Sequence, residues 1–437
     1  DYWENRKINA VIGNPPYVSL KNLDAKQREK VLQVVYSYGV NMQTSGSLWM
    51  PFIIHSTELL DAKGKLGFVL PYEITHVRYA LSLWEYLFDN YGKITICRIF
   101  NDFFPGVDVE TIILLAEGKG QKTNFVGYKV FETLSTLYKE KTIHTEKISI
   151  DDIINSNKPF ERGLIPQTTS LVLNNLRKET KLTKLISDCK FKIGYVSGNK
   201  KFFHLSKETI KLYNIKDENV RKCLVNAKQI NSNKNIGVET KMITRSGYLF
   251  YPLKMGGGEQ NYIKYGESLG IDKGYKCRVR TPWYITPGVF MPDFILTVFG
   301  DIPKLLINNG KFYVSNSLLS GFSSVENPKE IICRWYNSIT LLSIETVVHS
   351  LGGGTLVLIP GETDKLEIIS DFPKDKIEST YSSLAMFAEE NTIEDLYKYG
   401  DDIVLHNIYG LSKKAINEVR LAISILRSWR NPKKRRG

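Results

Sequence analysis

In the first ~120 residues, short apolar runs alternate with segments in which apolar residues have the spacing of a helix. Four short apolar runs have the length and composition of buried strands: 8–13, 65–70, 94–100 and 109–115. Three segments between them have the apolar spacing of helices: 27–38, 48–62 and 79–90. Because strands that alternate with helices are typical of a parallel α/β sheet, we predict such a sheet in this region.

The pattern changes after Gly118. Residues 119–160 look like a last strand followed by a connector, and from about Leu164 onward short strands, turns and short helices follow without regular alternation. The C-terminal residues have helical spacing, and their tail 427–436 contains six Lys or Arg. We therefore predict four parts: an α/β part over 1–125, a connector over 126–160, a mixed α+β domain over 161–385 and a helical segment with a basic tail over 386–437.

Charge and cysteine content narrow the function classes. The formal net charge of +13 favours a polyanionic partner such as nucleic acid, although it also fits an ordinary basic protein. The five cysteines form no CxxC pair, so we expect reduced thiols and no metal site. No apolar run is long enough to span a membrane, and we expect a cytoplasmic, nucleoid-associated prokaryotic protein.

The motif with the clearest chemical meaning is Asn14-Pro15-Pro16-Tyr17, directly after the strand 8–13. An amine on an aromatic ring is a poor nucleophile, because its lone pair is delocalised. The side-chain oxygen of Asn14 and the carbonyl of Pro15 could accept both of its N–H groups and free that lone pair. The two prolines fix the backbone and remove competing donors. The ring of Tyr17 could stack on the aromatic ring that carries this amine, and its electron-rich face suits a nearby sulfonium cation as methyl donor.

Residues 8–17 resemble motif IV of the amino-methyltransferases that use S-adenosylmethionine (AdoMet). The Asn form is typical of the gamma class of N6-adenine DNA methyltransferases, found in type I, type IIG and Taq-type modification enzymes. Residues 64–71 resemble the next strand of that family, and 103–115 resemble its motif VIII. The resemblance implies a Rossmann-like sheet, AdoMet as cofactor, and an extruded adenine held between Tyr17 and Phe104.

Further segments resemble the target-recognition domain of type IIG-like methylases: 192–198, 278–284, 316–317, 352–360 and 409–411. The resemblance implies that 161–385 binds double-stranded DNA. Arg and Asn read base edges and Lys mostly holds phosphates. The candidate contacts are Asn199, Lys200, Lys201, Arg278 and Arg280.

The family's AdoMet-binding motif is not found in this sequence. It should lie well upstream of the catalytic loop, yet only thirteen residues precede Asn14, and the glycine runs 256–258 and 352–354 lack the required strand and helix. We therefore expect the apolar strand 8–13 to be an open edge, completed by an upstream segment or a second chain. An alternative hypothesis is a non-catalytic DNA-binding fragment. A third hypothesis is a protein-glutamine or RNA methyltransferase, which the large basic C-terminal region disfavours.

Overall fold

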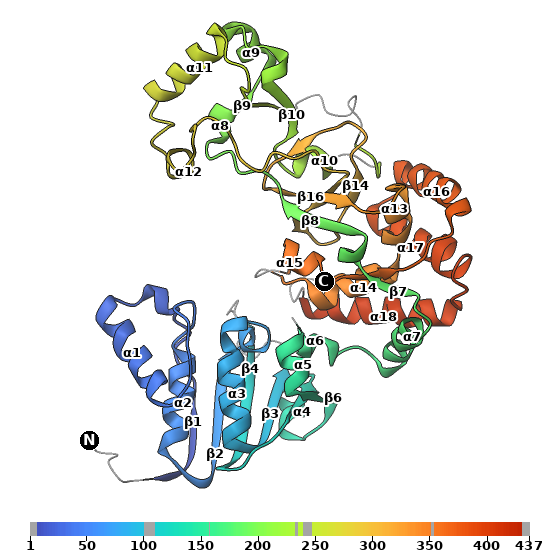
Figure 1. Cartoon of the computed structure of the whole chain (residues 1–437). Coiled ribbons are helices and arrows are strands. Elements are labelled where there is room, and N and C mark those ends of the chain that lie inside the picture. The colour runs from blue at the N-terminus through green and yellow to red at the C-terminus, as the bar shows by residue number, and fades with distance from the viewer. Residues whose placement is uncertain are drawn as a thin grey trace. The chain divides into compact units, whose positions relative to one another are not determined.

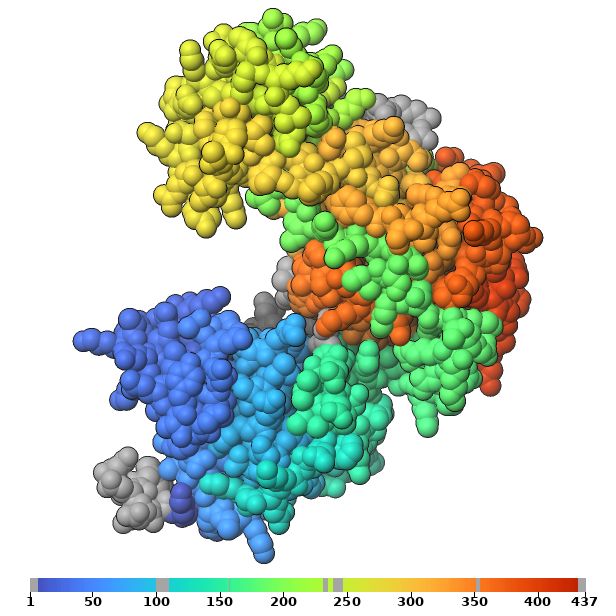
Figure 2. All heavy atoms as spheres, in the orientation of Figure 1, coloured from blue at the N-terminus to red at the C-terminus, as the bar shows by residue number. Residues whose placement is uncertain are grey.

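The computed structural model describes residues 7–99, 110–156, 158–231, 235–238, 247–350 and 354–430. The chain divides into two compact units, Asp1–Ile165 and Pro166–Gly437. In Figures 1 and 2 the first unit runs from blue to green and the second from green to red. Phe104, the glycines at 352 and 353 and the basic tail from residue 431 onward lie outside the described residues.

The first unit is built on a six-stranded sheet with the order β1-β2-β4-β3-β5-β6. Its strands are β1 (Ile8–Gly13), β2 (Leu60–Pro71), β3 (Tyr91–Ile99), β4 (Thr111–Lys119), β5 (Phe125–Phe131) and β6 (Thr142–Ser149). The predicted α/β class is confirmed. The prediction of a wholly parallel sheet is wrong, because β4 and β6 run antiparallel to their neighbours. The link from β3 to β4 is short, and a parallel pair needs a longer crossover, usually a helix.

Helices cover this sheet (Figure 1). They are α1 (Ala25–Ser37), α2 (Trp49–Leu59), α3 (Leu81–Asn90), α4 (Leu134–Tyr138), α5 (Ile150–Asn155) and α6 (Pro159–Arg162). Asp24 and Gln27 start α1 with a capping box. Trp49 and Ile53 of α2 are fully buried, and this helix packs on β2, while α3 packs on β3 and β4. The apolar faces of these helices therefore form the core of the unit.

The region 126–160 is not the connector that we predicted. It forms β5, α4, β6 and α5, which extend the sheet. Val126, Tyr128 and Val130 alternate inward along β5 and are fully buried, and β5 pairs parallel with β3. The outermost strand, β6, is largely exposed and polar, so its sequence has little of the apolar alternation that marks a strand.

The second unit is mixed α+β, as predicted, with two four-stranded sheets, β14-β12-β16-β8 and β15-β10-β11-β9, and two strand pairs, β13-β17 and β18-β7. Its strands are β7 (Leu182–Lys184), β8 (Cys189–Ile193), β9 (His204–Leu205), β10 (Val220–Leu224), β11 (Gly247–Phe250), β12 (Phe294–Thr297), β13 (Phe299–Gly300), β14 (Leu305–Ile307), β15 (Tyr313–Val314), β16 (Leu318–Ser323), β17 (Leu356–Val357) and β18 (Glu367–Ile369).

Helices complete this unit: α7 (Gln167–Lys178), α8 (Lys200–Phe203), α9 (Lys207–Tyr213), α10 (Lys228–Asn231), α11 (Gly257–Ser268), α12 (Tyr275–Arg278), α13 (Lys329–Trp335), α14 (Ser338–Val347), α15 (Pro360–Thr363), α16 (Ile377–Glu390), α17 (Ile393–Gly400) and α18 (Lys413–Arg430). The last helix packs on α14 and α7, and its Val419 and Ala422 are fully buried. The predicted boundary at residue 385/386 therefore does not separate two compact bodies.

Candidate functional site

The loop Asn14–Tyr17 lies at the carboxyl end of β1, which is where open α/β sheets bind ligands. Asn14 and Pro16 are exposed, Pro15 is buried and Tyr17 is half-buried. The hydroxyl of Tyr17 donates a hydrogen bond to the carbonyl of Val69 in β2, at 3.1 Å. The loop is thus anchored at Pro15 and Tyr17, while the side chain of Asn14, just before Pro15, is accessible.

Two local features define this anchor. A Cβ atom on Gly13 would lie 2.7 Å from a ring carbon of Phe68, so glycine lets the end of β1 approach β2 closely. Burial raises the pKa of Tyr17 to about 12, which keeps its hydroxyl protonated and able to donate to Val69 at neutral pH. The ring therefore stays uncharged and held against the sheet.

The outer edge of β1 is open within the described residues. Among the described strands, β1 pairs with β2 in parallel and lies at the edge of the sheet. Ile12 is 87% exposed, although its place in an apolar strand is typical of a buried position. Such an edge offers unpaired backbone groups and an apolar side chain to a further strand.

A buried charge network lies near the same end of the sheet, around Arg98 of β3. Arg98 is 2% exposed and ion-pairs with Glu110, and its guanidinium lies over the ring of Tyr72, 3.8 Å from the centroid. It also donates to the hydroxyl of Tyr72 at 2.9 Å, and that hydroxyl donates to Glu161 at 2.9 Å. Burial works against the charge on Arg98, but Glu110 offsets it and raises the pKa of Arg98.

This network was not predicted from the sequence, although an arginine inside an apolar strand is a signal that could have indicated it. Arg98 and Glu110 stand on either side of residues 100–109, so their ion pair joins the chain before and after that segment. Phe104, the second predicted base-stacking residue, belongs to that segment, and its role stays a prediction.

Three segments that resemble target-recognition sequence meet in the second unit. Arg280 donates to the carbonyls of Ser197, at 2.9 Å, and Val196, at 2.6 Å. The backbone N–H of Asn316 donates to the carbonyl of Tyr195 at 3.0 Å. The segments 192–198, 278–284 and 316–317 therefore form one contiguous structure. Both terminal nitrogens of Arg280 bond to backbone, which makes this residue an anchor between loops.

The other predicted DNA contacts are arranged differently. Asn199 caps α8, because its side-chain oxygen accepts the N–H of Phe202 at 3.0 Å. Lys200 and Lys201 are exposed in the single turn of that helix, and Arg278 is exposed at the end of α12. The side chains of the two lysines and of Arg278 are exposed to a partner, and contact with DNA remains a prediction for these three residues and for Asn199.

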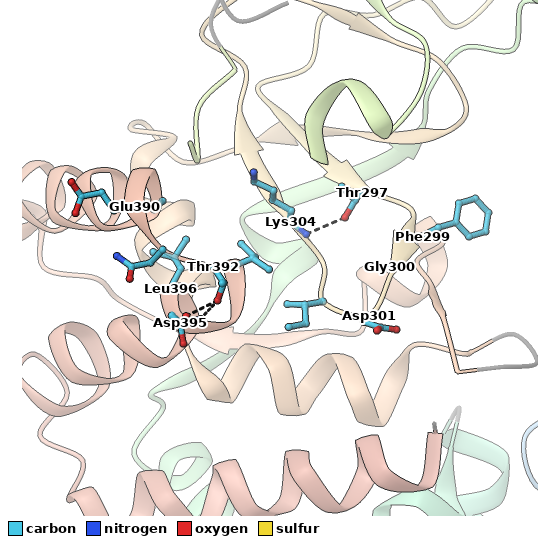
Figure 3. Close-up of a pocket in the computed structure, with 13 residues that line it drawn as sticks. Thr297, Phe299, Gly300, Asp301, Lys304, Glu390, Thr392, Asp395 and Leu396 are labelled. Carbon is cyan, nitrogen blue, oxygen red and sulfur yellow. Dashed lines mark hydrogen bonds between the residues drawn. The ribbon is translucent and has the colours of Figure 1, made fainter. Parts of the chain in front are cut away.

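A cavity of about 520 Å³ lies elsewhere in the second unit (Figure 3). Thr297 and Lys304, on β12 and just before β14, line one side, and Glu390, Thr392 and Asp395, around the start of α17, line the other. Lys304 is buried, and this burial lowers its pKa to about 8. No sequence signal marks this cavity, because its residues come from distant segments that share no motif.

In the described part of the chain, no group of three or more His, Cys, Asp or Glu could hold a metal ion. The five cysteines are buried free thiols. Among the described helices, none is both long and apolar enough to cross a bilayer.

Comparison with known proteins gives two family matches. Residues 157–405 match the family described as type II methyltransferase M.Eco57I, C-terminal domain, and residues 1–104 match the family described as Eco57I restriction-modification methylase. The type II methyltransferase M.AccI of Acinetobacter calcoaceticus is 25% identical over 300 residues, which are 64% of this chain and 53% of that protein. The type II methyltransferase M.BstVI of Geobacillus stearothermophilus is 32% identical over 91 residues, 21% of this chain and 16% of that protein.

A solved structure shares the fold over most of the chain. The type IIL restriction-modification enzyme MmeI, solved in complex with DNA, aligns with a TM-score of 0.53 and 12% sequence identity. The alignment covers 96% of this chain and 57% of MmeI. The chain thus spans about half the length of M.AccI and of MmeI.

Proposed function

Since the chain belongs to the M.Eco57I family of type II restriction-modification methyltransferases, we propose that it supplies the catalytic loop and the DNA-reading part of a site-specific adenine methyltransferase. The reaction is transfer of the methyl group of AdoMet to N6 of an adenine extruded from double-stranded DNA. The observation that carries this proposal is the Asn14–Tyr17 loop, anchored at the carboxyl end of β1 with Asn14 exposed.

Asn14 and Pro15 activate the amine in this proposal. The side-chain oxygen of Asn14 accepts one N–H of the adenine amino group, and the carbonyl of Pro15 accepts the other. These bonds favour a tetrahedral nitrogen with a free lone pair. With AdoMet bound, that lone pair would form the N–C bond as the C–S bond breaks, the sulfur would leave with the electrons of that bond, and the methylated amine would lose one proton to solvent. Buried Pro15 and the hydrogen bond from Tyr17 to Val69 hold both acceptors in place before the substrate arrives, so little reorganisation is needed.

Tyr17 provides a face for the base. Its ring is fixed through its hydroxyl and remains neutral, since its pKa is raised to about 12. A neutral aromatic face stacks on a purine and tolerates a nearby sulfonium. AdoMet, when bound, supplies the methyl group. Asn14 and Tyr17 are the residues of this chain that we place beside it.

The open edge of β1 bears on how the cofactor is held. We propose that the strands that bind AdoMet pair with β1 and cover Ile12, and that they belong to a further segment of the protein or to a second chain. Support comes from the exposure of Ile12 and from the unpaired side of β1 within the described residues. Isothermal titration of AdoMet into the assembled protein tests this: no binding would favour a DNA-binding module without catalysis.

The role of Asn14 is tested by substitution in the assembled protein. Asn14→Ala should lower the methyl-transfer rate by about 10²–10³-fold, the effect typical of losing one preorganised hydrogen-bonding group, and leave DNA affinity unchanged. Asn9→Ala is the matched control, because Asn9 lies on β1, the strand before this loop, and its amide donates a hydrogen bond to Asp61 at 2.6 Å. Full activity in Asn14→Ala would refute the proposed role.

A further inference from the structure

A surface of lysines and aromatic rings lies along β8, the edge strand of the sheet β14-β12-β16-β8, and includes residues next to that strand. Side chains alternate along this strand: Cys189 and Phe191 are buried, while Lys190 and Lys192 are exposed on the opposite face. Lys190 pairs in register with Phe322 of the neighbouring strand β16. We call Lys190, Lys192, Phe290 and Phe322 the β8 surface.

The ammonium group of Lys192 is held over two rings. Its nitrogen lies 5.5 Å from the ring centroid of Phe290 and 5.6 Å from that of Phe322. The two rings meet edge to face with centroids 6.5 Å apart, and Phe290 is 58% exposed. A cation over aromatic faces is partly ordered before it meets a ligand, so less side-chain entropy is lost on binding.

The lysines of this surface have no acidic partner among the described residues: neither Lys190 nor Lys192 forms an ion pair with a carboxylate there. Two exposed ammonium groups beside an exposed ring suit a polyanion that also presents apolar faces. A nucleic acid backbone has both features, since charged phosphates alternate with sugars along it.

The spacing also suits such a backbone. Residues two apart on one strand are separated by about 6.7 Å, twice the rise per residue. This is close to the separation of successive phosphates along one DNA strand. We propose that Lys190 and Lys192 bind two successive phosphates of duplex DNA and that the exposed ring of Phe290 packs on the sugar between them. The proposal rests on the proposed function in one respect, that duplex DNA is the substrate.

Edge lysines can also serve only to prevent pairing between sheets of different molecules. The two roles differ in the salt dependence of DNA binding. Each phosphate contact contributes about 0.9 to the slope of log affinity against log salt concentration. The double variant Lys190→Gln/Lys192→Gln should therefore have a slope shallower by about 1.8 than wild type, whereas a purely protective role leaves the slope unchanged.

The experiment measures fluorescence anisotropy of a labelled duplex of mixed sequence, titrated with the full 437-residue chain at several salt concentrations. Lys374→Gln/Lys376→Gln is the matched control: these lysines have the same spacing in sequence, are exposed in the same unit, and lie beside Glu326 and Asp375. The control should retain the wild-type slope. Phe290→Leu should weaken binding at every salt concentration without changing the slope.

The possible results separate the two proposals. If the wild type binds DNA and the β8 variant has the same slope of log affinity against log salt concentration, the proposal that the β8 surface binds phosphates is refuted. The methyltransferase proposal then still stands. An equal loss of slope in the control would also overturn the proposal for the β8 surface, because the effect would then follow net charge alone. Failure of the wild-type chain to bind any duplex would overturn both. Thermal melting by circular dichroism checks that these surface variants are folded.

Discussion

Removing the hydroxyl of Tyr17 and removing its ring should affect catalysis by different amounts. Tyr17→Phe deletes only the hydrogen bond to Val69, which spans 3.1 Å at a half-buried position. Such a bond contributes about 0.5–1.5 kcal/mol net. The ring would be less firmly held but still present. Since about 1.4 kcal/mol corresponds to tenfold in rate, Tyr17→Phe should reduce methyl transfer by about 2- to 10-fold.

Tyr17→Ala should be more severe. It removes the same hydrogen bond and also the aromatic face, and stacking of a base on an aromatic side chain contributes about 1–3 kcal/mol. Both losses together predict a reduction of about 10- to 10³-fold in methyl transfer. The two substitutions thus distinguish a stacking ring from a hydroxyl with a chemical role.

Two assays measure these effects in the assembled protein. Transfer of tritiated methyl groups from AdoMet to DNA gives the rate, and a duplex with 2-aminopurine at the target position reports capture of the extruded base. Tyr17→Ala should reduce the fluorescence increase on binding, and Tyr17→Phe should largely preserve it. Tyr138→Ala is the control, because Tyr138 is an exposed tyrosine on α4 of the same unit.

The pH dependence gives an independent check. Because the pKa of Tyr17 is raised to about 12, its hydroxyl should stay protonated at pH 7–10, and the wild-type rate should show no loss from its ionisation in that range. The reasoning is refuted if Tyr17→Phe is as inactive as Tyr17→Ala, since the hydroxyl would then matter more than the ring. Full base capture by Tyr17→Ala would exclude this residue from the pocket.

Two further predictions concern stability. Arg98→Met should lower the free energy of unfolding by about 1.5–3 kcal/mol in urea, because it removes a charged hydrogen bond from the buried hydroxyl of Tyr72 and the cation beside Glu110; Lys122→Met, which breaks an exposed pair with Asp89, should cost at most about 1 kcal/mol, and equal losses would contradict this reasoning. Burial lowers the pKa of Lys304 to about 8, so protonating this amine below pH 8 costs more free energy in the folded state than in the unfolded state. The free energy of unfolding should therefore rise as pH increases from 8 to 10.5, the ordinary pKa of lysine. Lys304→Met should therefore be more stable than wild type by up to about 3 kcal/mol at pH 7 and lose that advantage by pH 10.5; a difference in melting temperature that is constant with pH would contradict it.

The parts that sequence predicted well depend on local pattern. The strand before Asn14 and the next three strands were identified from continuous apolar runs, and the helices between them from their spacing. The exposure of Ile12 on β1 agrees with the expectation that this apolar strand pairs with sequence other than the segments identified here. These inferences need only the residues of one segment.

The errors involve contacts between distant segments. Strand direction in β4 depends on how the chain returns after β3, and the exposed strand β6 takes its place by pairing with β5 rather than from an apolar pattern. The position of Arg280 between two loops was likewise not predicted, and its contact with DNA stays a prediction. Its bonds to Val196 and Ser197 join residues far apart in sequence, which no local pattern reveals. The cavity around Lys304 was missed for the same reason.

The central claim is that the loop 14–17 directs a methyl group to the exocyclic amine of adenine. The most direct measurement is mass spectrometry of nucleosides from duplex DNA incubated with AdoMet and the assembled protein, wild type or Asn14→Ala. We predict N6-methyladenine with the wild type and a loss of at least about 100-fold with Asn14→Ala. Methylation of a different base, or undiminished N6-methyladenine with Asn14→Ala, would contradict the claim.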